Sequence, residues 1–174
     1  MRNSILATFH NQRDNTQLDG GNWLGVMRRY LTFIAVANLV WESLQLPLYT
    51  IWLEAEAGMM LFAVVHCTAG DILIATATLV LALSLFGSSA WPYTGHRKVV
   101  IFTIAMGLGY TIFSEWLNTE VRESWAYSEL MPTLPILGTG LSPIAQWIVI
   151  PLAAFWWARL STPVLLQPIK ETPL

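Results

Sequence analysis

The chain has 174 residues, of which 55% are hydrophobic and only 11% are charged, and its formal net charge is −2. A soluble domain usually carries about 25% charged residues, so this composition excludes an ordinary soluble fold and favours an integral membrane protein. The slight negative charge, with no basic stripe, argues against a nucleic-acid partner, and the single cysteine excludes an internal disulfide or a CxxC redox motif.

The first segment, residues 1–28, is polar and shows no sustained helical period, so it is expected to form an N-terminal tail with at most a short surface helix. Its apolar part, SILATF, is too short for the h-region of a cleavable signal. Insertion into a membrane is therefore expected to depend on the first membrane helix.

Four later segments are long and apolar enough to cross a bilayer, which takes about 20 residues each. They are expected over residues 30–49, 59–86, 99–118 and 140–160. Residues 119–139 would form a long loop between the last two helices, and residues 163–174 a second polar tail. The sequence thus predicts an all-α integral membrane bundle of four transmembrane helices, contained in one domain over residues 29–162.

The distribution of Lys and Arg predicts the orientation of the bundle, because cytoplasmic loops of membrane proteins carry an excess of both. Eight of the nine basic residues fall in the N-terminal segment, the loop at 87–98 and the C-terminal segment. The two opposite loops hold only Arg122, together with several glutamates. Both termini are therefore expected to be cytoplasmic, with the 119–139 loop outside.

Polar side chains gather at one depth on all four predicted spans. An ionisable residue inside a span costs a few kcal/mol and usually faces the bundle interior, where it marks function. Counting about 1.5 Å per residue along each helix places six polar residues in a common layer of the outer half. They are Glu42, Gln45, His66, Glu115, Asn118 and Gln146. Asp71 is expected one to two turns deeper, and no comparable layer is expected in the inner half. We therefore expect a polar cavity in the outer half.

Four residues of this cavity are the candidate catalytic set: Glu42, His66, Asp71 and Glu115. Three carboxyls with one imidazole as counter-ion cannot all be charged in a low-dielectric layer, so at least one of them, Asp71 first, is expected to be protonated. A protonated carboxyl beside an ionised one is the arrangement that general acid–base catalysis needs. The pattern thus favours isomerisation, cyclisation or hydration of a small lipid-soluble, isoprenoid-like molecule that enters from the membrane.

Further residues are expected to bind the ligand beside this set. They are Asn38, Trp41, Gln45, Tyr110, Asn118, Trp125, Tyr127 and Gln146. Trp41 and Trp116 could stabilise a cationic intermediate by cation–π contact. The 119–139 loop would cover the mouth of the cavity, with Trp125 and Tyr127 anchoring a short surface helix over residues 119–131. Cys67 is expected to pack rather than react, because a buried thiol behaves as a small hydrophobe.

Other interpretations stay open. Glu42, His66, Asp71 and Glu115 could instead ligate zinc, iron or manganese, although no ExxH or HExxH spacing is present. The chain could also be an accessory or assembly subunit of a larger membrane complex, or a homo-oligomer, in which buried polar groups join helices. A proton or solute pathway is a further alternative, which the apolar inner half disfavours. The sequence specifies no cofactor.

Four stretches carry a resemblance: WESLQLPLYTIW, HCTAGD, SEWLNTEVRESWAYSELMP and GLSPIAQW, which lie within residues 30–160. In this combination the chain resembles a group of small four-helix bacterial inner-membrane proteins. The resemblance implies a multi-pass protein of the bacterial inner membrane, surrounded by the lipid bilayer, and it brings no activity. In style the chain is also similar to small membrane isoprenoid enzymes of the lycopene cyclase and sterol isomerase types, which use acidic and aromatic residues on membrane helices. No residue of either type is matched position by position, so no role is carried over.

Overall fold

A computed structural model describes residues 2–88 and 91–160 of the chain, with side chains from residue 23 onward. This part of the chain consists of helices joined by turns and loops. Its four long helices are α1 (Arg2–Gln45), α3 (Ala57–Phe86), α4 (His96–Trp116) and α5 (Leu141–Leu160). The C-terminal tail expected over residues 163–174 lies outside the described residues.

The four long helices confirm the predicted all-α fold. Each contains a segment that is long and apolar enough to cross a membrane: Trp23–Leu48, Ala57–Phe86, His96–Val121 and Leu141–Leu160. Large apolar side chains point away from the bundle, as at Leu73, Ile101 and Trp156, which are 70%, 68% and 66% exposed. Such a surface suits hydrocarbon better than water, so the helices support a multi-pass membrane protein.

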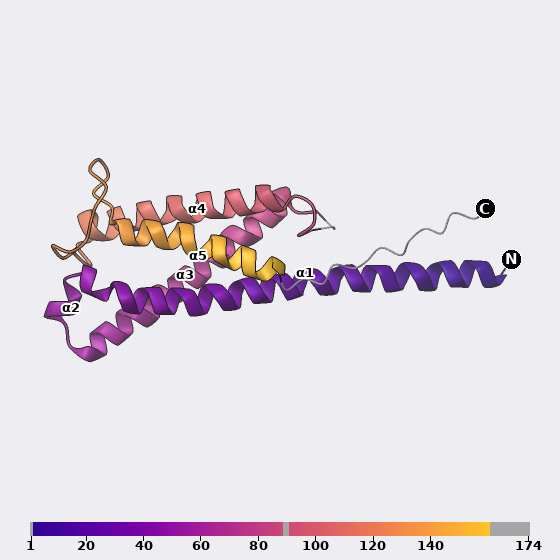
Figure 1. Ribbon diagram of the computed structural model, residues 1–174, viewed down its shortest axis with the longest axis horizontal. Coiled ribbons are helices and arrows are strands. Elements are labelled where there is room, and N and C mark those ends of the chain that lie inside the picture. Colours follow the sequence, from indigo (N-terminus) through magenta and orange to yellow (C-terminus); the bar gives the residue numbers. More distant parts are fainter. Residues whose placement is uncertain (1, 89–90, 161–174) are drawn as a thin grey trace.

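The N-terminal segment differs from the expectation of a tail with at most a short helix. Helix α1 is continuous from Arg2 to Gln45, although the segment before the first span contains Gly20 and Gly21. Extending an existing helix adds one hydrogen bond per residue without a new nucleation cost, which allows the span to continue into a polar segment. Figure 1 shows the result, a helix that projects well beyond the rest of the bundle.

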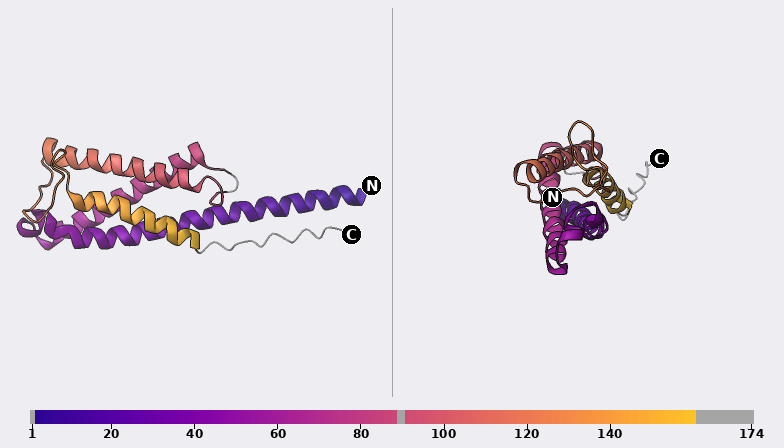
Figure 2. Two further views of the ribbon diagram at one scale, coloured as in Figure 1. Left: turned by 45° about the horizontal axis from the view of Figure 1, so that its top comes forward. Right: turned by 90° about the vertical axis from the view of Figure 1, so that its left-hand side faces the viewer.

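The helices form a square bundle in which α1 and α4 each pack between α3 and α5 (Figure 1 and Figure 2). Helix α3 runs obliquely across this bundle, from the side of α1 to the side of α4. The end of the bundle at which α1 and α4 finish and α3 and α5 begin holds the candidate site, and we call it the pocket end. Helix α1 begins, and helix α5 ends, toward the opposite end.

Close packing within the bundle relies on aromatic side chains and a glycine. The rings of Tyr30 and Phe155 stack with their centroids 4.5 Å apart. Gly107 lies against the ring of Trp147, where even one added methyl group would overlap the indole. The hydroxyls of Tyr30 and Thr103 and the indole nitrogen of Trp91 are also buried here, without a hydrogen-bond partner among the described residues.

A lid, which we define as residues 122–140, crosses the pocket end between α4 and α5. Helix α4 first continues as one π-helical turn, Leu117–Val121, and α1 ends in a 3₁₀ turn, Leu46–Leu48, followed by the short helix α2 (Ile51–Glu54). Thr50 N donates to Ala126 O at 3.0 Å, and Ser128 N donates to Leu48 O at 2.9 Å. The surface helix expected over 119–131 is therefore wrong beyond Val121, because the lid backbone at Ala126 and Ser128 pairs with the segment after α1 instead of continuing a helix.

Candidate functional site

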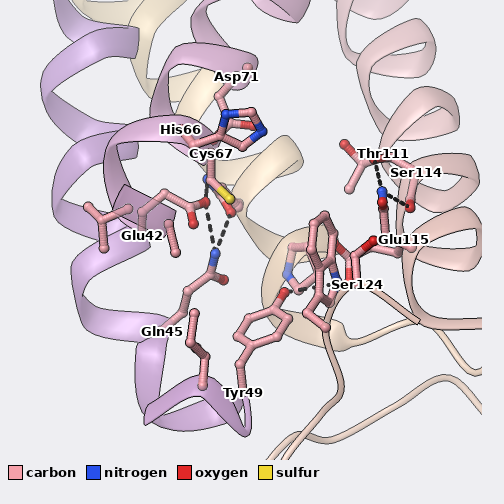
Figure 3. A pocket seen from close by; sticks show the side chains of 18 of the residues that line it. Glu42, Gln45, Tyr49, His66, Cys67, Asp71, Thr111, Ser114, Glu115 and Ser124 are labelled. Atoms are coloured by element: carbon pink, nitrogen blue, oxygen red, sulfur yellow. Dashed lines mark hydrogen bonds between the residues drawn. The ribbon is translucent and has the colours of Figure 1, made fainter. Parts of the chain in front are cut away.

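A cavity of about 530 Å³ lies at the pocket end, and its walls come from all four long helices and the lid. All four candidate catalytic residues line it, together with five of the predicted ligand-binding residues: Gln45, Tyr110, Asn118, Trp125 and Gln146. Figure 3 shows Glu42 and Gln45 on one side of the cavity and Glu115 on the other, with Tyr49 between them. The six polar residues that helix counting placed in one layer thus all line a single cavity.

One wall of the cavity is built on a pair of carboxyls that share a donor. Nε2 of Gln146 donates to Glu42 Oε1 at 2.8 Å and to Asp71 Oδ2 at 3.0 Å. The three side chains belong to three helices, α5, α1 and α3, and all of them are buried. Two carboxyls held this closely are stable when they share one proton, because two adjacent negative charges repel each other. This wall can therefore hold or release a proton.

A chain of amide and hydroxyl groups supports this pair from α1 and α5. Gln45 Nε2 donates to Glu42 Oε1 at 2.8 Å, and Ser142 Oγ donates to Gln45 Oε1 at 2.8 Å. Trp41 Nε1 donates to Ser142 Oγ at 3.2 Å. Asn38 accepts from Gln146 Nε2 at 2.8 Å. Asn38 and Trp41, both predicted to bind ligand, therefore lie behind the cavity wall, where they position the residues that line it.

The opposite wall holds Glu115 among phenols. Tyr127 donates a hydrogen bond to Glu115 Oε2, and the hydroxyl of Tyr49 lies 3.5 Å from the same oxygen. Burial, and then its bond to Glu115, raise the pKa of Tyr127 above its ordinary value. Burial, and then the negative charge of Glu115, raise the pKa of Tyr49. Both phenols therefore keep their protons at neutral pH and act as donors to this carboxyl.

Tyr127 is itself a lid residue, and its oxygen also accepts a hydrogen bond from the backbone of another lid residue, Gly140 N, at 3.0 Å. Tyr127 was predicted to touch ligand and to anchor a surface helix. Its place between Glu115 and the lid backbone makes it a positioning residue instead. The lid is thus joined to the carboxyl that it covers.

His66 and Cys67 differ from the expectation that His66 belongs to the catalytic set and Cys67 only packs. His66 lies on the exposed rim of the cavity, where its ring stacks on Phe62 with centroids 5.4 Å apart. Among the described residues no hydrogen bond or ion pair joins His66 to Glu42, Asp71 or Glu115, so it is not their counter-ion. Cys67, expected to pack, is a half-buried free thiol on the cavity wall.

Asp71 was expected one to two turns deeper than Glu42. Figure 3 shows it farther than Glu42 from the end of the cavity that holds Tyr49. Its carboxyl nevertheless meets that of Glu42 at one donor, because both accept a hydrogen bond from Nε2 of Gln146.

The aromatic residues that line the cavity differ in part from those expected. Neither Trp41 nor Trp116 lines the cavity, and Trp116 is 49% exposed and packs against Phe113 instead. The aromatic residues that do line it are Tyr49, Phe62, Tyr110, Trp125 and Trp147. Of these, Tyr49, Phe62 and Trp147 were missed as site residues. Pro47 in the sequence was the available signal for Tyr49, because a proline that ends the helix lets the following residues turn over the bundle.

The described residues of the cavity do not supply a grouped set of metal ligands, as the metal-handling alternative requires. Within residues 23–88 and 91–160, whose side chains the structure describes, no three His, Cys, Asp or Glu side chains are grouped so that they could hold a metal ion. Glu42 and Asp71 lie together, whereas His66 is on the rim and Glu115 is on the facing wall.

No protein-family model, curated protein or solved structure matches this chain. Its function is therefore argued from the geometry and chemistry of the cavity, and the resemblance to small bacterial inner-membrane proteins stays a prediction.

Proposed function

We propose that this protein binds a small lipid-soluble, isoprenoid-like molecule in the cavity at its pocket end and performs acid–base chemistry on it. The observation that carries this proposal is the arrangement of carboxyls around one space. Glu42 and Asp71 share the donor Gln146 on one wall, and Glu115 is held by phenols on the facing wall. The volume of about 530 Å³ is within the range of small-molecule sites.

The two walls suit the two roles in a proton transfer, one as the proton donor and the other as the proton acceptor. The Glu42–Asp71 pair can donate the proton that it shares, while Glu115 can accept a proton from the other side of the substrate, or the two can act in reverse. Such a transfer is an isomerisation when both steps involve one molecule, because no atom is gained or lost. The lid over the cavity limits the access of water, which would compete for the proton.

The proposed setting is the bacterial inner membrane, with both termini in the cytoplasm and the pocket end outside. Its support is the distribution of basic residues, of which Arg122 is the single one in the described loops of the pocket end. The exposed apolar surfaces of the four long helices supply the lipid contact.

An assembly or accessory role is the second candidate, and one observation favours it. Gln146 links α5 to α1 and α3 through hydrogen bonds to Asn38, Glu42 and Asp71, which is how polar side chains join membrane helices. This role accounts for the Gln146 network. It gives no reason for Glu115 to face the cavity under a lid.

Purification in a mild detergent, followed by extraction of bound lipids and analysis of bound metals, separates these candidates. We expect an apolar molecule at a ratio near one per chain in the native protein. Glu115→Gln and Asp71→Asn should lower that ratio, whereas Glu54→Gln, an exposed residue of α2 away from the cavity, should not. Stoichiometric metal that is lost in the first two variants would replace the proposal with metal handling, and a native protein with neither ligand nor metal would favour assembly.

A further inference from the structure

The lid closes the cavity toward the aqueous side of the pocket end. Its backbone is bonded to the segment after α1 through Thr50 and Ser128, and the hydroxyl of Ser128 adds a bond to Pro47 O at 2.9 Å. Tyr127 joins the same lid to Glu115. A ligand that arrived straight through this end would have to break these contacts.

The cavity is also open along its flank, between α3 and α4. Four of its lining residues there are exposed: His66, Met59 at 55%, Phe62 at 62% and Tyr110 at 49%, while Arg122 and Ser124 are exposed lining residues on the side of the lid. A residue that both lines a cavity and is exposed outside marks its mouth. We call this place the side mouth, and its rim is formed by Met59, Phe62, His66 and Tyr110.

The side mouth opens on a surface suited to lipid. Met59, Phe62 and His66 belong to the apolar segment Ala57–Phe86, and Tyr110 belongs to His96–Val121, both long enough to cross a membrane. Beside the rim, α3 and α4 present exposed apolar side chains, including Leu61, Val65 and Phe113. An apolar chain lying in the membrane would therefore meet apolar contacts up to the edge of the cavity.

The interior selects for a head group that donates hydrogen bonds. The amide and phenol donors recorded around the cavity reach one oxygen of each carboxyl: Glu42 Oε1, Asp71 Oδ2 and Glu115 Oε2. Carboxyl groups accept through both oxygens, so a hydroxyl or amine can add to this arrangement. A carboxylate or phosphate head would meet like charge instead.

We propose that the ligand is a lipid-soluble alcohol or amine that enters sideways from the membrane, between the pocket-end halves of α3 and α4. Its head group lies among Glu42, Asp71 and Glu115, and its apolar chain passes Phe62 and Tyr110 into the membrane. This inference rests on the proposed function and adds the route and the chemical class of the ligand.

The test uses the full chain in liposomes and three photoreactive probes: a long-chain alcohol, an amine and a carboxylic acid of equal chain length, each with a diazirine in the middle of the chain. Labelled positions are mapped by mass spectrometry of peptides. The alcohol or the amine should label the rim of the side mouth about tenfold more than lipid-facing Leu73 and Ile101, as expected for a bound over a free probe. The double variant Glu42→Gln, Asp71→Asn should abolish most of this excess.

A matched pair of variants tests the route. Ala63 lines the cavity beside the side mouth, whereas Ala69 on the same helix is exposed and does not line it. Ala63→Phe should lower rim labelling about tenfold, and Ala69→Phe should leave it unchanged. Helix content measured by circular dichroism confirms that both variants are folded.

Each contrary result has a defined meaning. Unchanged labelling in Ala63→Phe with loss in the carboxyl variant overturns the side route. Preferred labelling by the carboxylic acid overturns the alcohol or amine class and points to an anionic head at Arg122. If no probe labels the rim above Leu73, while the purified protein still carries an apolar molecule, the route and class both fall and the proposed function stands.

Discussion

Glu42 and Asp71 accept hydrogen bonds from one nitrogen, Nε2 of Gln146, at 2.8 and 3.0 Å. The two carboxyls come from α1 and α3, and the amide comes from α5, so one donor joins three helices at the wall of the cavity. One donor therefore couples the packing of three helices to the charge state of the two carboxyls.

Replacing the donor should destabilise the bundle. Gln146→Leu removes the amide that faces Asn38, Glu42 and Asp71, and it leaves two buried carboxyls without it. We expect a loss of about 1–3 kcal/mol in the free energy of unfolding, because each buried acceptor loses a partner. Unfolding of the purified protein in detergent, followed by circular dichroism, measures this loss.

The Asp71→Asn background supplies the control for that experiment. With one acid removed, Gln146→Leu should cost less than in the native chain, because only one carboxyl is left to be desolvated without a donor. Equal costs in the two backgrounds would contradict the coupling between Asp71 and Gln146.

Gly107 should be intolerant of any side chain. A methyl group there would overlap the ring of Trp147, which lines the cavity, whereas Gly109 on the same helix has open space around it. Gly107→Ala is expected to lower stability by about 1–3 kcal/mol through overpacking, which unfolding of the purified protein in detergent measures. Gly109→Ala is the matched control and should be neutral or slightly stabilising, since alanine favours a helix more than glycine does. Similar behaviour of the two variants would argue against the close contact.

Tyr30 should tolerate the loss of its hydroxyl. The ring is fully buried against Phe155, but the oxygen has no hydrogen-bond partner among the described residues. Tyr30→Phe is therefore expected to be neutral or to stabilise the protein by about 1 kcal/mol, while Tyr30→Ala should cost about 3–5 kcal/mol because it leaves a cavity. Thermal unfolding compares the two. A clear loss of stability in Tyr30→Phe would mean that the hydroxyl has a partner.

The lid should loosen when Tyr127 loses its hydroxyl. Tyr127→Phe removes the bonds to Glu115 and to Gly140 N, while the backbone bonds of the lid persist. Cys67, a free thiol on the cavity wall, reports the opening through its reaction with a water-soluble thiol reagent. We expect the rate to rise about tenfold, which corresponds to about 1.4 kcal/mol of lost hydrogen bonding.

Two further variants serve as controls for the measurement of lid opening. Tyr49→Phe should raise the rate less, because the hydroxyl of Tyr49 lies 3.5 Å from Glu115 and is the weaker contact. Cys67→Ala should abolish the labelling altogether. An unchanged rate in Tyr127→Phe would show that the backbone contacts alone hold the lid.

The sequence was sufficient to predict the four long helices, because their apolar length follows from composition. It also placed Glu42, Glu115 and Gln146 in one layer, since regular helices convert residue number into depth. Counting did not show that Asp71, expected deeper than this layer, shares the donor Gln146 with Glu42. It also could not choose between His66 and Cys67, because neighbouring residues on a helix point about 100° apart and the rotation of α3 is fixed only by packing.

The contacts of the lid were beyond sequence reasoning for a different reason. The bonds from Tyr127 to Glu115, and from the lid backbone to Leu48 and Thr50, join segments that no periodic pattern relates. Aromatic residues near a span end are typical membrane anchors, so Tyr127 was interpreted as an anchor, whereas its hydroxyl bonds to Glu115.

The most direct test of the account is an experimental density map of the native protein in lipid nanodiscs. The account predicts elongated density for an apolar molecule within the cavity between the pocket-end halves of α3 and α4, with its polar end within hydrogen-bonding distance of Glu42, Asp71 or Glu115. A side-chain arrangement in which these carboxyls face the lipid, or a cavity filled by protein side chains, would contradict it.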